Sequence, residues 1–224
     1  MWRGHPQTLM AERLVAQGNI GELALIRAAL SVDAPPGDIR RTGALGGGAS
    51  LDLGCYCLSA IRLFGSEPAR IAAVAVRDDA PGAGGEDLRL AASLQLADGV
   101  LAQFDVALDF PRRDELELIG TKGKLTIPDP WLCREGHLVL ERGGQRQVIP
   151  VVSGDGQRLT EPGEENLDAY RLEFEEASRI IAGTARQRFG RTDAINQAAA
   201  LQAVRDAAAS GRWIDVPLAA EPRA

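Results

Sequence analysis

The chain has 224 residues, of which 45% are hydrophobic and 25% charged, and its 31 acidic and 25 basic side chains leave a formal net charge of −6. This composition predicts a globular protein without a nucleic-acid partner, since phosphate binding needs a basic surface. No apolar run approaches the roughly 20 residues that span a bilayer, so we expect no membrane contact. Three cysteines and two histidines are too few for a zinc or His-rich metal site, so we expect no metal. We also expect the thiols to be reduced and the protein to be cytoplasmic.

Helical and strand patterns alternate in the first part of the chain. Apolar spacing predicts a helix over residues 6–17 and an alternating strand over residues 22–32. A loop rich in proline and glycine follows over residues 34–48, and a second helix is predicted over residues 50–64.

Strands joined by tight turns are predicted in the middle of the chain. Residues 88–96 and 100–108 alternate on either side of an Asp-Gly turn, and their even-numbered side chains are expected to face the helices. A shorter pair of strands is predicted around the turn at residues 120–123, and another hairpin over residues 137–152.

Helices return near the carboxyl end. One is predicted from an apolar stripe at helical spacing, which we expect to face inward: Leu167, Tyr170, Phe174, Ala177 and Ile181. A last helix is predicted between Thr192 and Gly211. This order predicts an α+β fold, with a mostly antiparallel, open-faced sheet covered by helices on one face. The odd-numbered face of residues 88–108 indicates either a sheet-mediated dimer interface or an ordinary solvated face.

The stretch from Gly46 to Tyr56, with the sequence GGGASLDLGCY, is the part of the chain that indicates chemistry. Three glycines allow a tight backbone turn before a helix, and Asp52 and Tyr56 share one helix face because they are four residues apart. A phenol beside a carboxylate can act as an acid/base pair if a cation lowers the phenol pKa from about 10. Alternatively, Asp52 helps to cap the helix start and Tyr56 is a half-buried surface aromatic. The glycines do not match a dinucleotide fingerprint, which would need a glycine where Leu51 stands.

The motif GGGxxxDxGxY resembles the signature of the Gfo/Idh/MocA oxidoreductases, in the branch of glucose–fructose oxidoreductase and the aldose and dihydrodiol dehydrogenases. Supporting matches are MWRGHPQ at residues 1–7, DIR at 38–40, GTKG at 120–123 and SGRW at 210–213. The resemblance covers residues 1–224 as the family's C-terminal substrate-binding and oligomerisation domain. It implies an NAD(P)-dependent oxidoreductase that acts on a CH–OH group of a sugar or a related diol.

The resemblance also implies roles for single residues. Tyr56 would be the proton donor or acceptor at the sugar hydroxyl or carbonyl, and Asp52 would orient the substrate. Gly47 and Gly48 would lie near the nicotinamide of the cofactor.

Three further polar residues are candidates for binding substrate hydroxyls: Arg3, His5 and Arg40. Each also has a structural interpretation. The two arginines can serve as ion-pair partners, and His5 can serve as a helix-start residue because Pro6 follows it.

Members of this family begin with a Rossmann domain that binds NAD(P) and supplies a catalytic lysine, and neither is found in these 224 residues. We expect the complete protein to use NAD or NADP, and this truncated chain alone to bind neither and to be inactive. It would be a fragment, the product of a wrongly assigned gene start, or a genuinely short protein. Helices within residues 1–20 and 50–65 would face the missing domain. Four apolar side chains would then be exposed: Trp2, Leu9, Leu51 and Leu63.

The alternative to an enzyme is a stand-alone, non-catalytic domain that dimerises or binds a sugar-like ligand, because a fold alone does not settle function. In either case, the expected partners are a sugar or diol and a second copy of the chain, bound through the sheet face.

Overall fold

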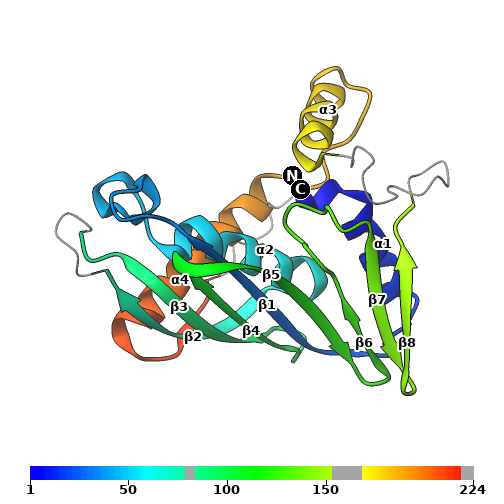
Figure 1. Cartoon of the computed structure of the whole chain (residues 1–224), viewed down its shortest axis with the longest axis horizontal. Coiled ribbons are helices and arrows are strands. Elements are labelled where there is room, and N and C mark those ends of the chain that lie inside the picture. Colours follow the sequence, from blue (N-terminus) through cyan, green and yellow to red (C-terminus); the bar gives the residue numbers. More distant parts are fainter. Residues whose placement is uncertain (79–83, 153–167, 218–224) are drawn as a thin grey trace. The chain divides into compact units, whose positions relative to one another are not determined.

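The computed structural model describes most of the chain: residues 1–78, 84–152 and 168–217. The chain divides into two compact units, of which unit 1 comprises residues 1–24 and 115–188 and unit 2 comprises residues 25–114 and 189–224. Figure 1 labels the helices and strands in chain order. Strands β1 (Leu23–Asp33) and β5 (Asp109–Gly120) each contribute residues to both units.

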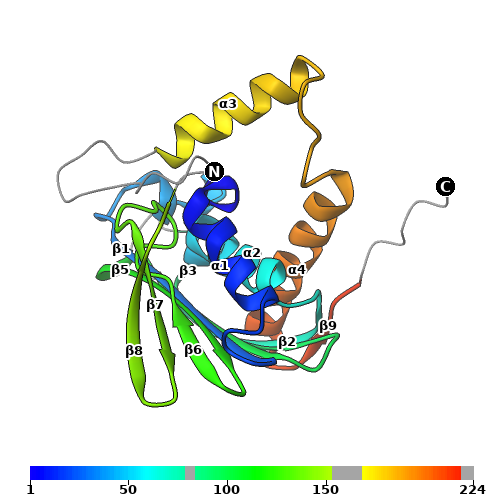
Figure 2. The same cartoon turned by 90° about the vertical axis from the view of Figure 1, so that its right-hand side faces the viewer.

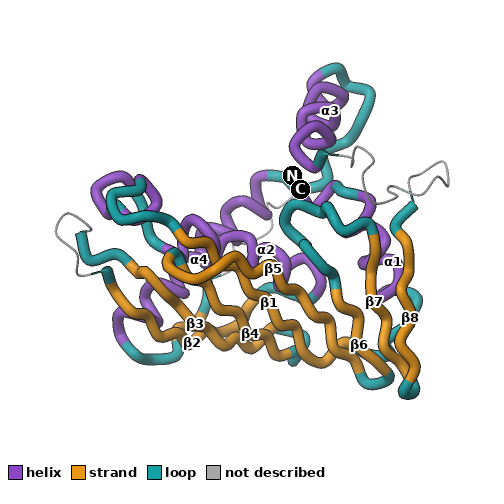
Figure 3. Tube along the Cα trace, viewed as in Figure 1, coloured by secondary structure: helices purple, strands orange, loops and turns teal. Residues whose placement is uncertain are grey.

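The described part of unit 2 contains most of β1, the amino half of β5 and four further strands: β2 (Pro68–Arg77), β3 (Asp87–Leu96), β4 (Leu101–Ala107) and β9 (Ile214–Asp215). From β1 onward, the strand order in the described part of this unit is β1-β4-β3-β2-β9, and each of these neighbouring pairs is antiparallel except β1 with β4. Figure 3 colours the strands orange. The predicted hairpin between β3 and β4 is confirmed. Its turn is closed by the Asp98 carboxylate, which accepts a hydrogen bond from the Val100 amide at 3.1 Å.

The alternation along β3 and β4 decides which side chains of unit 2 are buried. Even-numbered residues from Leu90 to Leu96 and from Val100 to Leu108 are at most 9% exposed, as expected. Leu88 is only half-buried and Asp87 is buried in its place. The reason is an irregularity in the pairing of β2 with β3. Val76 and Arg77 are consecutive but pair with Arg89 and Asp87, so Leu88 is the extra residue of a bulge in β3.

Helices α2 (Cys55–Phe64) and α4 (Arg191–Ser210) lie on the same side of β2 (Figure 2). α2 packs against β4, and α4 packs against β2 and α2. Both helices bury small or aliphatic side chains: Cys57, Leu58, Ala60 and Ile61 from α2, and Ala200, Ala203, Val204 and Ala207 from α4. Within unit 2, helices therefore cover one face of the strands, as the sequence predicts.

One segment bears on the expectation that the chain does not contact a membrane. Gly43–Phe64 is long and apolar enough, by length and composition, to cross a bilayer, although we expected no run of that size. However, 56% of its most apolar window is buried inside the protein. The core helix of a folded domain passes the same test, so this segment is weak evidence for a membrane span.

The described part of unit 1 contains the carboxyl half of β5 and the following α-helices and strands: α1 (Pro6–Ala16), α3 (Ala169–Ile181), β6 (Gly123–Thr126), β7 (His137–Arg142) and β8 (Gln145–Pro150). The strands run in the order β5-β6-β7-β8, each antiparallel to the next, and α1 packs against β7. The α+β fold with mostly antiparallel strands is confirmed.

Trp2 contradicts the expectation that it would be exposed. It is 4% exposed, because its ring packs edge-on against Trp131 with the centroids 5.5 Å apart. Leu9, Leu51 and Leu63 are half-buried.

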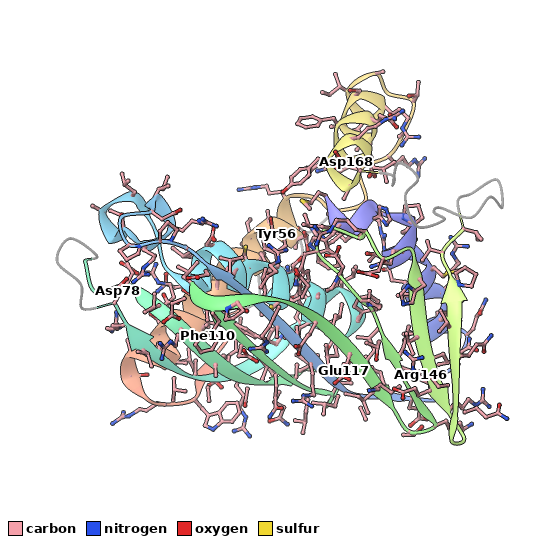
Figure 4. All side chains as sticks on the ribbon, in the orientation of Figure 1. Tyr56, Asp78, Phe110, Glu117, Arg146 and Asp168 are labelled. Atoms are coloured by element: carbon pink, nitrogen blue, oxygen red, sulfur yellow. The ribbon has the colours of Figure 1, made fainter. Side chains whose placement is uncertain are left out.

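Helix α3 contradicts the prediction of an inward-facing stripe. Tyr170, Phe174 and Ile181 are 47%, 71% and 87% exposed, and Leu167 lies outside the described residues. Helical spacing shows that one face is apolar, but it does not show that another element covers that face. α3 begins after Asp168, labelled in Figure 4, whose carboxylate accepts a hydrogen bond from the Tyr170 amide at 2.9 Å.

Candidate functional site

The Gly-Asp-Tyr motif begins the helical segment of unit 2 with an unusually wide turn. Residues Ser50–Gly54 form a π-helical turn, and α2 continues from Cys55. Such turns, with hydrogen bonds from residue i to i+5, occur often at functional sites. Asp52 lies on the π-turn and Tyr56 in the first turn of α2, and both side chains are half-buried. Figure 4 labels Tyr56. The motif therefore places both chemistry-bearing side chains at the start of one helix.

Asp87, the first residue of β3, caps this helix start. Its carboxylate accepts hydrogen bonds from the Ser50 amide at 2.6 Å and from the Ser50 hydroxyl at 2.9 Å. Burial raises the pKa of Asp87, and the two Ser50 bonds oppose the rise. The capping role that the sequence offered as an alternative for Asp52 thus belongs to Asp87. No local pattern signals this, because Asp87 and Ser50 are 37 residues apart.

The Asp52 carboxylate is left open by this arrangement. The Asp52 backbone amide donates a hydrogen bond to the Gly48 carbonyl at 3.0 Å. No described residue donates a hydrogen bond to the Asp52 carboxylate. Burial raises the pKa of Asp52, the positive charge of Arg40 opposes the rise, and the negative charge of Asp38 adds to it. An ionisable oxygen acceptor with unused lone pairs is thus available at the helix start.

The glycines serve close packing within unit 2. A Cβ atom on Gly47 would come within 2.5 Å of the Arg40 carbonyl oxygen, and one on Gly48 within 2.7 Å of an Asp87 carboxylate oxygen. Gly48 also has a φ of +116°, a conformation that L side chains rarely adopt. Both glycines therefore face atoms of this chain at these positions.

Arg40 lies in the short 3-10 helix Ile39–Arg41, which precedes the glycines in the chain. Its guanidinium donates to Asp38 through Nε at 2.9 Å and Nη2 at 2.8 Å, and its backbone amide donates to the same carboxylate at 2.9 Å. This arginine holds the pKa of Asp38 well below its usual range. Of the predicted site residues, unit 2 thus holds five: Arg40, Gly47, Gly48, Asp52 and Tyr56.

The other two predicted site residues, Arg3 and His5, belong to unit 1. His5 is 1% exposed, and its Nδ1 accepts a hydrogen bond from the Gln7 amide at 3.1 Å, which caps α1. This is the helix-start role that the sequence offered as the alternative for His5. Arg3 is half-buried in the short 3-10 helix Trp2–Gly4.

Arg62 supports the helical segment of residues 50–64 that carries the motif, called the motif helix below. This arginine was not identified from the sequence. Its side chain is 3% exposed, and its guanidinium bonds to both carboxylate oxygens of Glu67 at 2.7 Å. It also binds Gln197 of α4 at 2.8 Å, and the Gln197 amide group donates to the Cys55 carbonyl at 3.0 Å. These bonds fasten the turn before Tyr56 to α4.

The described residues offer neither a group of metal ligands nor a reactive thiol at this helix. No three His, Cys, Asp or Glu side chains in residues 1–78, 84–152 and 168–217 are grouped so as to hold a metal ion. Burial raises the pKa of Cys55 to about 11, and burial raises the pKa of Cys57 well above its ordinary value. Thiols that stay protonated at neutral pH are poor nucleophiles.

Comparison with known proteins places this domain. The model for the GFO/IDH/MocA C-terminal domain matches residues 8–126. The chain is 27% identical over 220 residues to D-xylose 1-dehydrogenase (NADP(+)) 2 of Haloferax volcanii, covering 96% of this chain and 63% of that protein. It is 30% identical over 160 residues to trans-1,2-dihydrobenzene-1,2-diol dehydrogenase of Bos taurus, covering 70% of this chain and 45% of that protein.

Solved structures agree on the fold. Levoglucosan dehydrogenase in complex with NADH and levoglucosan superimposes with a TM-score of 0.79 at 19% identity, over 96% of this chain and 65% of that one. The chain thus spans less than two thirds of the length of these relatives. Because the family model covers more than half of the chain, the chain belongs to the Gfo/Idh/MocA family of oxidoreductases and contains that family's C-terminal domain.

Proposed function

We propose that this chain is the substrate-domain portion of an NAD(P)-dependent oxidoreductase that acts on a CH–OH group of a sugar or a related diol. The observation that carries the proposal is the start of the motif helix, where Tyr56 lies one turn after an open Asp52 carboxylate and Arg40 places positive charge beside that carboxylate. The relatives support the substrate class, since they include a xylose dehydrogenase and a dihydrodiol dehydrogenase.

In this proposal, Tyr56 moves the proton and Asp52 holds the substrate. Oxidation of CH–OH to a carbonyl removes a proton from oxygen and a hydride from carbon, and the deprotonated phenolate oxygen of Tyr56 takes the proton. The Asp52 carboxylate accepts a hydrogen bond from a substrate hydroxyl, which orients the reacting carbon. When bound, the nicotinamide accepts or supplies the hydride.

The described residues do not by themselves fit a dinucleotide cofactor. Gly47 and Gly48 pack against Arg40 and Asp87, so neither glycine offers an open cradle for a phosphate. The only lysines of the chain are Lys122 and Lys124, and Lys124 is paired with Glu117 and Glu141. We therefore propose that the complete protein binds NAD or NADP, and provides the cation for Tyr56, through residues outside these 224.

Arg3, His5 and Arg40 complete the proposed set of substrate contacts. Arg40 is supported by its position near Asp52. Arg3 and His5 enter on the resemblance alone, and the capping bond to Gln7 already gives His5 a sufficient structural role. The free thiols of Cys55, Cys57 and Cys133 support a reducing, cytoplasmic location.

We further propose that two copies associate through the face of β2, β3 and β4 that the helices leave bare. Val74, Val76 and Leu101 are 69%, 53% and 54% exposed there. A shallow groove of about 230 Å³ is lined by Val74, Val76, Arg89, Ala91, Asp105 and Phe110. Phe110 is labelled in Figure 4. The face also carries both signs of charge, as in the Arg89–Asp109 and Arg113–Asp105 pairs. A two-fold dimer needs a self-complementary surface, because the same patch of both copies forms the interface.

The decisive experiment compares the two tyrosines of the chain. In the complete protein that contains these residues, Tyr56→Phe should lower kcat for oxidation of D-xylose, levoglucosan or a dihydrodiol by about 10²-fold or more, the usual scale for a lost general acid or base. Tyr170→Phe on α3 is the control, and it should leave kcat unchanged. An unchanged kcat in Tyr56→Phe removes Tyr56 from the mechanism. The 224-residue chain alone should show no saturable quenching of NADH or NADPH fluorescence.

A further inference from the structure

Asp38 and Arg40 form an unusually complete pair for residues so close in sequence. One carboxylate accepts three hydrogen bonds from the same arginine, through the backbone amide, Nε and Nη2. The Asp38 carbonyl also accepts a hydrogen bond from the Thr42 hydroxyl at 3.1 Å. Asp38 therefore fixes both the backbone and the side-chain direction of Arg40.

The backbone of Arg40 is connected to Asp52 by two hydrogen bonds in series. The Arg40 carbonyl accepts from the Gly48 amide at 2.8 Å, and the Gly48 carbonyl accepts from the Asp52 amide at 3.0 Å. The guanidinium is close enough for its charge to act on the Asp52 carboxylate, yet no hydrogen bond joins these two groups. The Nη1 group of Arg40 makes no hydrogen bond to any described residue.

An arginine beside an open carboxylate would ordinarily pair with it, because a bidentate arginine–carboxylate contact is one of the stronger polar interactions in proteins. Here Asp38 already occupies the Nε side of the guanidinium. We propose that Asp38 is a positioning residue that holds Arg40 off Asp52, so that the Nη1 donor and the Asp52 acceptor both stay open to neighbouring hydroxyl groups of a polyol.

The polyol in this proposal rests on the proposed function, whereas the separation of Arg40 from Asp52 rests on the hydrogen bonds that Arg40 makes to Asp38 and on the effect of its charge on Asp52. Among the described residues, the charged side chains that shift the pKa of Asp52 are Arg40 and Asp38. Burial raises the pKa of the Cys55 thiol, and the charge of Asp52 in turn adds to that rise. A measurement on Asp52 in the 224-residue chain can therefore test the separation without cofactor or turnover.

The experiment titrates the Asp52 carboxyl by carbon-13 NMR in labelled protein. In Asp38→Asn the released Arg40 should pair with Asp52, and the pKa of Asp52 should fall by about 1 or more. Part of any fall comes from the lost charge of Asp38 itself, so the same substitution is repeated in an Arg40→Met background. There the fall should be much smaller. An equal fall in both backgrounds overturns the proposal, as does no fall or a rise in Asp38→Asn.

Two further variants keep the test interpretable. Asp114→Asn releases Arg112 from a comparable pair two residues apart, and it should leave the pKa of Asp52 unchanged. Arg40→Met alone should raise the pKa of Asp52, and this readout survives even if Asp38→Asn fails to fold. If Arg40→Met produces no rise, the guanidinium does not act on Asp52 and the proposal fails. Failure of the proposed function would appear separately, as an active Tyr56→Phe enzyme.

Discussion

Replacing Asp87 with alanine should destabilise unit 2 at the helix that carries Asp52 and Tyr56. The substitution leaves two donors of the fully buried Ser50 without a partner, its amide and its hydroxyl. A buried donor without a partner costs about 1–3 kcal/mol. The buried carboxylate carries a desolvation cost of its own, which reduces the net loss, so we expect the free energy of unfolding to fall by about 2–4 kcal/mol.

Urea denaturation followed by circular dichroism measures this loss. Asp206→Ala on the exposed side of α4 is the control, and it should change the free energy of unfolding by no more than about 0.5 kcal/mol. Hydrogen exchange adds a local readout, because the Asp52 amide should lose protection when the helix start is uncapped. An Asp87→Ala protein as stable as the parent would refute the capping argument.

The pH dependence of the same substitution has a definite sign. Burial raises the pKa of Asp87 above its value in the unfolded chain, so the folded state holds this proton more tightly. The stability contributed by this group is therefore full below the unfolded pKa, near 4, and declines as the pH rises through the folded pKa. The cost of Asp87→Ala should be larger at pH 4 than at pH 7. The opposite order would contradict the burial argument.

Three other substitutions test separate features. Gly47→Ala should lower the free energy of unfolding by about 1–3 kcal/mol, because the added Cβ would come within 2.5 Å of the Arg40 backbone. Gly190→Ala is the control, since an added Cβ there meets no atom within 4 Å, and it should lower the free energy of unfolding by about 0.5 kcal/mol or less in the same denaturation assay. Val74→Arg should shift the proposed dimer toward monomer in sedimentation equilibrium, and Val148→Arg, also at an exposed position but on β8, should not. Phe174→Ser on the exposed face of α3 should change stability by less than about 0.5 kcal/mol but reduce binding of a hydrophobic dye, whereas Leu118→Ala in the core should cost about 2–5 kcal/mol.

The strands of unit 2 were predictable because local rules govern them. The alternation of residues 88–108 and the Asp98-Gly99 turn together specify a hairpin and its buried face. Leu88 departs from the pattern because it is the extra residue of a bulge in β3, and the alternation of residues 88–96 does not signal that bulge.

The burial of two apolar features, the stripe of α3 and Trp2, was predicted wrongly for the same reason. The stripe of α3 is exposed and Trp2 is buried, which reverses both expectations. Apolar periodicity identifies which face of an element can be buried, but burial depends on a partner elsewhere in the chain. Trp131 is that partner for Trp2, and it lies 129 residues away in sequence.

The candidate site shows the same division between the residues that carry chemistry and those that hold them. Asp52, Tyr56 and the glycines form a contiguous motif, so the sequence alone identifies them as a group. Their supports are Asp87 on β3 and Gln197 on α4, which reach the helix from 37 and 142 residues away. Asp38 is the instructive case, because it lies beside the motif in sequence but its importance depends on the direction of one arginine side chain. A motif specifies which functional groups are present, whereas whether Asp52 is open or paired is decided by contacts that only the folded chain reveals.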